Sequence, residues 1–265
     1  MSFVFSPSHR GGSGPPLVCL HGFTGTWRVW ELVLPALERR HDVLALTLPG
    51  HAGGPRLPEA LSDSTLPDAI ERLMDEAGFD RAHLVGNSLG GFFALQLAAR
   101  GRASSVVALA PAGGWSEIDE SVGRMLMSFV EMRDLLAALA PYADAIAATP
   151  EGRRRATQLI TVNYAHIPPE LIAHLICGVA GCTEVARFVA HARRAGWDLA
   201  TDRIDCPVRV VWGTEDRLLP WPGSATRYGG SLPQADWVVL DGVGHCPQLD
   251  VPLETAELSL GVTAA

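Results

Sequence analysis

A serine framed by glycines is the first group in this sequence that could do chemistry. It occurs in the stretch LVGNSLGG, residues 84–91, with Gly86 two positions before Ser88 and Gly90 two positions after it. Glycine lacks a Cβ, so it permits sharp turns and close backbone packing. The residues before Gly86 are typical of a buried strand and those after Gly91 of a helix, which places Ser88 in a tight strand-to-helix turn beside free helix N–H groups. The pattern predicts a nucleophilic hydroxyl, provided that a base and an acid lie near it.

A base and an acid follow later in the chain. A serine hydroxyl is a weak nucleophile until a neighbouring base takes its proton, and the base needs an acid that orients it. His245 stands in DGVGHCPQLD, just after the apolar run WVVL, and Asp216 stands in WGTEDRLLP, just after VRVVW. The order Ser88, Asp216, His245, each at the end of a separate apolar run, is one of the known orders of a catalytic triad.

The elements expected to position these residues are short apolar strands that alternate with amphipathic helices. Continuous apolar runs of this kind are typical of parallel strands that helices cover on both faces. In such sheets the site lies at the carboxyl ends of the strands. The expected strands are 17–20, 43–46, 83–85, 106–109, 208–212 and 237–240, and the expected helices lie near 27–39, 66–77 and 89–100. The fold class is therefore α/β with a mostly parallel central sheet.

The alternation stops between residues 113 and 200. This stretch has no convincing strand and contains three helical patterns, at 123–140, 150–165 and 168–194. We interpret it as a helical lid inserted over the strand ends. The predicted organisation is a core formed by 1–112 and 201–265, interrupted by a lid at 113–200.

In these motifs the chain resembles the α/β-hydrolase fold family, in its lidded serine-hydrolase branch. The resemblance covers nearly the whole length, is weakest in the lid, and rests on HGF, LPGH, GNSLGG, GTEDRLLP and GHCPQLDVP. It implies that Ser88 attacks a carbonyl carbon, that His245 transfers the proton, and that Asp216 rather than Glu215 holds the imidazole. By the same resemblance the backbone N–H groups of Phe23 and Leu89 form the oxyanion hole.

Other residues that could do chemistry have simpler interpretations. Trp115, Met127 and Phe129 are expected to form the apolar core of the lid and to line a substrate pocket. Cys246 is expected to be a small buried residue, since buried cysteines are mostly structural. The histidines and cysteines of the lid do not match a zinc-ligand spacing, so neither a metal nor another cofactor is expected.

Composition narrows the class of protein. The 265 residues, 48% of them hydrophobic and 19% charged, fit one large globular unit. The formal net charge of −8 argues against nucleic acid as a partner, and the absence of lysine excludes a Schiff-base lysine and a phosphate-binding P-loop lysine. The five cysteines, the lack of an evident signal peptide and the lack of an 18-residue apolar run favour a cytoplasmic location without a membrane span. The oligomeric state stays open, with a homodimer among the options.

The predicted function is hydrolysis of a carboxylic ester through an acyl-serine. The alternative is hydrolysis of a C–C bond in a vinylogous diketone acid, which would need an arginine for the substrate carboxylate; Arg124, Arg133 and Arg187 could serve. Thioesterase, lactonase and perhydrolase activities and a non-catalytic ligand-binding role rank lower. Epoxide hydrolase and haloalkane dehalogenase are disfavoured, because relatives with those activities have aspartate at the position of Ser88. The sequence does not specify the substrate, its acyl length or its stereochemistry.

Overall fold

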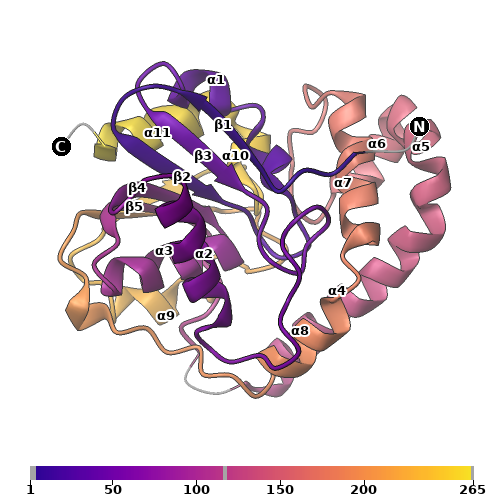
Figure 1. Cartoon of the computed structure of the whole chain (residues 1–265). Coiled ribbons are helices and arrows are strands. Elements are labelled where there is room, and N and C mark those ends of the chain that lie inside the picture. The colour runs from indigo at the N-terminus through magenta and orange to yellow at the C-terminus, as the bar shows by residue number, and fades with distance from the viewer. Residues whose placement is uncertain (1–3, 116–117, 264–265) are drawn as a thin grey trace.

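A twisted seven-stranded sheet forms the centre of the molecule (Figure 1). The computed structural model describes residues 4–115 and 118–263. Across the sheet the strand order is β1-β3-β2-β4-β5-β6-β7. The strands are β1 (Ser8–Gly12), β2 (Pro16–Leu20), β3 (Asp42–Leu46), β4 (Ala82–Asn87), β5 (Ala103–Leu109), β6 (Val208–Gly213) and β7 (Asp236–Leu240).

All strands run parallel except β1, which pairs antiparallel with β3 at one edge. The six strands expected from the sequence are confirmed. Strand β1 was not expected, because its sequence SHRGG has no apolar run. An edge strand packs little of its surface into the core, so main-chain pairing with β3 holds it instead.

Helices cover both faces of the sheet (Figure 1). The core helices are η1 (Trp27–Trp30), α1 (Leu34–Leu37), α2 (Thr65–Glu76), α3 (Leu89–Ala99), α9 (Thr226–Gly229), α10 (Pro247–Asp250) and α11 (Pro252–Thr263). Successive strand side chains point to opposite faces. Leu84 of β4 therefore packs with α2, α3 and α9, whereas Val85 packs with α1 and α11. The helix expected near 27–39 is split into η1 and α1, with Pro35 in the first turn of α1.

The segment between β5 and β6 is helical, as expected, and lies to one side of the sheet (Figure 1). We call residues 118–200 of this segment the cap. The pattern at 150–165 is helical only as far as Thr157, and the pattern at 168–194 is two helices separated at residues 182–184. The cap helices are α4 (Glu120–Leu139), η2 (Ala140–Tyr142), α5 (Ala143–Ala148), α6 (Pro150–Thr157), α7 (Pro169–Gly181) and α8 (Val185–Ala192), followed by η3 (Thr201–Arg203).

Two apolar clusters join the cap to the core. The cluster that includes α2 and α3 continues into α4 and α8 through Leu126 and Phe188. A separate cluster packs α5 and α7 against Cys246 and Leu249, next to His245. The cap therefore packs on the core through two separate clusters. One contains Leu89, the neighbour of Ser88, and the other contains Cys246, the neighbour of His245.

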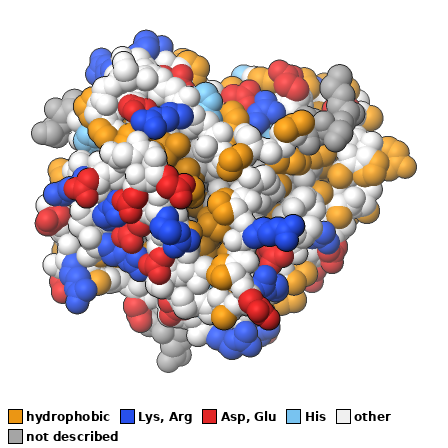
Figure 2. All heavy atoms as spheres, in the orientation of Figure 1, with side chains coloured by type: hydrophobic (Ala, Val, Ile, Leu, Met, Phe, Trp, Pro, Cys, Tyr) orange, Lys and Arg blue, Asp and Glu red, His pale blue; other side chains and the backbone are white. Residues whose placement is uncertain are grey.

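Over α2 and α3 arginine and acidic side chains interleave, with Arg100 paired to Asp68 and Glu71 (Figure 2). Within residues 4–115 and 118–263 no single helix is both long and apolar enough to cross a membrane. Helices α7 and α8 reach that length and composition only as a pair bent by 68°.

Candidate active site

The sharp turn at Ser88 results from close packing around the carboxyl end of β4. Ser88 has φ 54° and ψ −116°, a conformation that residues other than glycine rarely adopt. A Cβ on Gly86 would come within 2.2 Å of the carbonyl oxygen of Gly90, and one on Gly90 within 2.1 Å of that of Leu20. Glycine is therefore required at both positions. Main-chain bonds from Ser88 N to Leu109 O (2.8 Å) and from Phe92 N to Ser88 O (3.0 Å) hold the turn.

His245 and Asp216 form a buried hydrogen-bonded pair. Asp216 follows β6, His245 follows β7, and Nδ1 of His245 lies 2.7 Å from Oδ2 of Asp216. The other carboxylate oxygen accepts hydrogen bonds from the N–H groups of Leu218 (2.9 Å) and Leu219 (2.8 Å). A carboxylate accepts hydrogen bonds, so a neutral imidazole here carries its proton on Nδ1 and has the lone pair on Nε2. Glu215 is exposed, so the structure pairs His245 with Asp216 and not with its neighbour.

The loop that contains Phe23 packs against the turn. A Cβ on Gly22 would lie 3.2 Å from Cβ of Ser88, so this loop approaches the serine closely. His21 bridges the loop: its Nε2 accepts from Leu48 N at 2.8 Å, and its Nδ1 donates to Gly22 O at 2.7 Å. Complete burial lowers the pKa of His21 well below the usual range, which keeps the ring neutral. His21 thus fixes the loop through hydrogen bonds from both ring nitrogens.

The first residue of α3 is Leu89, directly after Ser88. The first N–H groups of a helix have no partner within the helix, so they are free to bind a negatively charged oxygen. Leu89 and Phe23 both line the same cavity as Ser88. The two residues expected to form the oxyanion hole therefore lie beside the cavity onto which Ser88 opens.

An apolar pocket of about 30 Å³, room for about two water molecules, opens onto Ser88 and His245. Core and cap both contribute to its walls. The remaining lining residues are Phe23, Leu89, Ala112, Trp115, Met125, Leu126, Phe129, Phe188, Trp197, Leu218 and Leu219. None of these side chains is charged.

The structure includes Trp115 and Phe129 in this pocket but not Met127. Met127 is 40% exposed and lines a separate open hollow on the outside of α4. On a helix, residues three or four apart share a face, so Met125 and Phe129 point inward together while Met127 points away. The expectation for Met127 is therefore corrected: Met125 and Leu126 occupy the place assigned to it.

Two aromatic residues of the cap hold the side chain of Phe23. The ring of Phe23 lies 5.1 Å from that of Phe129, at an interplanar angle of 74°, and 4.7 Å from that of Phe188, at 32°. Aromatic pairs at these separations stabilise each other beyond simple burial. Phe129 of α4 and Phe188 of α8 thus fix the ring of Phe23 beside the pocket.

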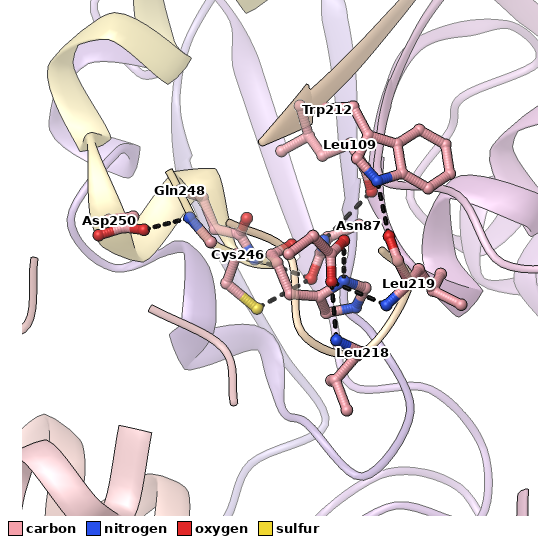
Figure 3. A network of polar contacts seen from close by, with 11 residues as sticks. Asn87, Leu109, Trp212, Leu218, Leu219, Cys246, Gln248 and Asp250 are labelled. Carbon is pink, nitrogen blue, oxygen red and sulfur yellow. Dashed lines mark hydrogen bonds and ion pairs between the residues drawn. The ribbon is translucent and has the colours of Figure 1, made fainter. Parts of the chain in front are cut away.

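Asn87, the residue before Ser88, organises the loop that carries His245 (Figure 3). Its side-chain amide is 2% exposed and donates to Leu109 O (3.1 Å) and to His245 O (2.9 Å). Its Oδ1 accepts from Gln248 Nε2 (3.1 Å) and from Cys246 Sγ (3.3 Å). All of its polar atoms are therefore used within the protein.

Sequence reasoning missed the positions of Asn87, Gln248 and Asp250. The signal available was a polar residue at the end of an apolar strand, and two more in the short stretch after His245. Those types are usually exposed, so burial at 2% or less marks them as structural parts of the site.

Cys246 and the cap histidines have structural surroundings. Burial raises the pKa of the Cys246 thiol far above its usual value, and nearby Asp216 and Asp250 raise it further, so the sulfur stays protonated. His174 bonds to Thr26 Oγ1 at 3.0 Å, and His166 Nε2 donates to Leu249 O at 2.9 Å. Among the residues that the structure describes, no three His, Cys, Asp or Glu side chains are grouped so as to hold a metal ion.

The chain belongs to the α/β-hydrolase fold family, whose model matches residues 15–252. It is 31% identical to epoxide hydrolase EphH of Mycobacterium tuberculosis over 199 residues, which are 75% of this chain and 93% of that protein. It is 25% identical to monoacylglycerol lipase ABHD6 of Rattus norvegicus, covering 99% of this chain and 79% of that protein. A meta-cleavage product hydrolase from Pseudomonas fluorescens IP01 shares the fold with a TM-score of 0.71 at 23% identity, covering 97% of this chain and 93% of that one.

Proposed function

We propose that this α/β hydrolase cleaves carboxylic esters through an acyl-serine intermediate on Ser88. The observation that carries the proposal is the buried His245–Asp216 pair, whose imidazole opens onto the same apolar pocket as Ser88. Family membership supports hydrolysis in general. The particular chemistry follows from a serine, rather than a carboxylate, at the strained turn.

Each group has a role in two half-reactions. His245 Nε2 takes the proton of Ser88 as the hydroxyl oxygen attacks the ester carbonyl, and the N–H groups of Phe23 and Leu89 stabilise the oxyanion. His245 then gives the proton to the leaving alcohol, and the acyl group stays on Ser88. Water, deprotonated by His245, attacks the acyl carbon; the bond from this carbon to Ser88 Oγ then breaks, His245 returns the proton to Oγ, and the acid is released. Asp216 stabilises the imidazolium in both steps.

The pocket favours an ester over a C–C bond flanked by a carboxylate. A substrate carboxylate in an apolar cavity needs a cation, and none of the described residues that line the pocket is an arginine or a lysine. The arginines considered for that role are engaged elsewhere: Arg124 pairs with Glu120, Arg133 with Asp134, and Arg187 with Glu184. We therefore propose uncharged acyl groups as substrates; thioesters, lactones, perhydrolysis and non-catalytic binding rank below esters.

Epoxide opening is the second candidate, because the relative at 31% identity is named an epoxide hydrolase. Attack by a carboxylate on an epoxide gives an ester that water can hydrolyse. Attack by Ser88 would give an ether, which the same site cannot hydrolyse. Ester hydrolysis therefore fits the residue at this turn better.

A substrate panel with Ser88→Ala as the reference tests the proposal. We expect wild-type protein to hydrolyse p-nitrophenyl esters, Ser88→Ala to lose turnover, and a fluorophosphonate probe to label Ser88. Styrene oxide and a dienoic keto acid, assayed in parallel, report the epoxide and C–C alternatives. Retention of esterase activity by Ser88→Ala, labelling at another residue, or turnover of only the epoxide or keto acid would overturn the proposal.

We extend the proposal to the setting of the enzyme. Its partner is a small-molecule ester, it needs no cofactor, and it works in the cytoplasm. The lid is residues 113–200, as the sequence indicates. A homodimer stays an option that size-exclusion chromatography with light scattering decides.

A further inference from the structure

The buried carboxylate of Asp250 connects two distant parts of the chain. Asp250 is 2% exposed and accepts hydrogen bonds from Gly244 N (2.6 Å), Asn163 N (2.5 Å) and Val162 N (3.0 Å). Gly244 directly precedes His245, whereas Val162 and Asn163 belong to the cap segment between α6 and α7. One side chain thus joins the histidine loop to the cap.

Further contacts join the same two segments. Cys246 N, directly after His245, donates to Ile160 O at 2.8 Å. A Cβ on Gly244 would lie 2.9 Å from Ile160 O and 3.0 Å from Thr161 Cα, so the cap backbone packs directly on this glycine. Both neighbours of His245 in the chain are therefore held by residues 160–163, one directly and one through Asp250.

We propose that residues 160–163 and Asp250 form a platform that positions His245, with Asp250 as a positioning residue. The proposal rests on the proposed function, because it assigns a role in setting the general base. In this view the α6–α7 segment is part of the catalytic scaffold, although it lies within the sequence of the cap.

The platform divides the cap into two parts with different attachments. The α6–α7 segment is tied by hydrogen bonds, including Arg217 Nη1 to Gln158 O at 3.2 Å and His166 Nε2 to Leu249 O at 2.9 Å. Over the pocket, α4 and α8 contact the core through side chains such as Phe129 and Phe188 on Phe23. Helix α8 also donates hydrogen bonds to the core, from Arg187 Nη2 to Pro58 O (2.8 Å) and Glu59 O (2.9 Å), but neither acceptor is a neighbour of His245 in the chain.

Asp250→Asn tests the platform with little change of shape. The asparagine presents an N–H₂ group to main-chain N–H donors, so at least one of these donors loses its acceptor. We expect kcat for p-nitrophenyl acetate to fall roughly 10- to 100-fold with KM changed less than about twofold, because misplacement of a catalytic group affects the chemical step. The matched control is Glu254→Gln on the exposed start of α11, which should leave kcat unchanged.

Gly244→Ala is a second variant that tests the platform if Asp250→Asn does not fold. Its methyl group pushes residues 160 and 161 away without removing a charge, and we expect the same selective loss of kcat. Gly230→Ala, where an added Cβ meets nothing within 4 Å, is the matched control. Normal kcat in either folded variant of the platform overturns the proposal, as does an equal loss in the control.

Hydrogen exchange separates this inference from the proposed function, because it does not depend on activity. In Asp250→Asn we expect the amides of 160–163 and 243–246 to lose protection together. Joint loss in a protein without esterase activity would refute only the proposed function. Unchanged protection, or loss in one segment alone, would refute the platform even if Ser88 is the nucleophile.

Discussion

The side-chain amide of Asn87 donates a hydrogen bond of 2.9 Å to the main-chain carbonyl oxygen of His245. Asn87 is the residue before Ser88, so a single side chain relates the proposed nucleophile to the proposed base. It also donates to Leu109 at the end of β5. The spacing between serine and histidine therefore depends on a residue that does not line the pocket.

We expect Asn87→Ala to lower kcat about 10-fold, because His245 O and Leu109 O lose their donor and the loop shifts. Each carbonyl left unsatisfied costs about 1–3 kcal/mol of the free energy of unfolding, so thermal denaturation should show the loss as well. Gln248→Met is the control, since it removes one bond to Asn87 Oδ1 and leaves both donor bonds intact. A larger kinetic effect of Gln248→Met than of Asn87→Ala would contradict this role.

Asp216→Asn should lower kcat by roughly 10⁴, the loss found for the equivalent change in a serine protease triad. The reason is that an amide donor facing Nδ1 favours the other tautomer, in which Nε2 carries the proton and is no longer a base. Steady-state kinetics on p-nitrophenyl acetate measures the loss. Glu215→Gln, at the exposed neighbour, should have almost no effect, and the opposite pattern would show that the acid is misassigned.

Phe129→Ala should shift the preference toward longer acyl chains, chiefly through KM. The pocket of about 30 Å³ is smaller than a long acyl group, and removal of this ring enlarges it. Contacts with a substrate tail are equal in the ground and transition states, so they affect KM before kcat. Met127→Ala, two residues away on the outside of α4, should leave the profile over p-nitrophenyl acetate to decanoate unchanged; equal shifts in both variants would contradict the pocket as described.

Acid should destabilise the fold between pH 6.5 and 4, partly through His51. Burial lowers the pKa of His51 from 6.5 to about 4, so in this window the unfolded chain binds more protons than the folded one. The free energy of unfolding therefore falls as the pH falls, by up to about 3 kcal/mol for this group. Thermal melts at pH 7 and pH 5 should show a smaller difference in Tm for His51→Asn than for the wild type. An identical difference would mean that His51 does not contribute.

The sequence by itself determined the sheet strands β2 to β7, because each contains a continuous apolar run. Such a run is typical of a strand covered on both faces, which holds for β2 to β6, whereas β7 at the sheet edge leaves Val239 exposed. It also indicated the turn at Ser88 through the glycines two positions before and after the serine. The structure gives the reason for them, because a Cβ on Gly86 or Gly90 would collide with backbone atoms. Both features depend on residue types that are close together in the sequence, so they can be predicted without the folded structure. Strand β1 lacks such a signal, and its main-chain pairing with β3 appears only in the folded sheet.

Tertiary structure alone decided which polar residues are buried and which cap side chains face inward. Asn87 and Asp250 are polar residues of types that are usually exposed, so the sequence does not show that they are buried. Asn87 bonds to His245 O, 158 positions away in the chain, and Asp250 bonds to Val162 N, 88 positions away. Met127 and Phe129 are both apolar, and only the rotation of α4 against the core separates pocket from surface. Such choices depend on packing between segments remote in sequence, which local periodicity does not encode.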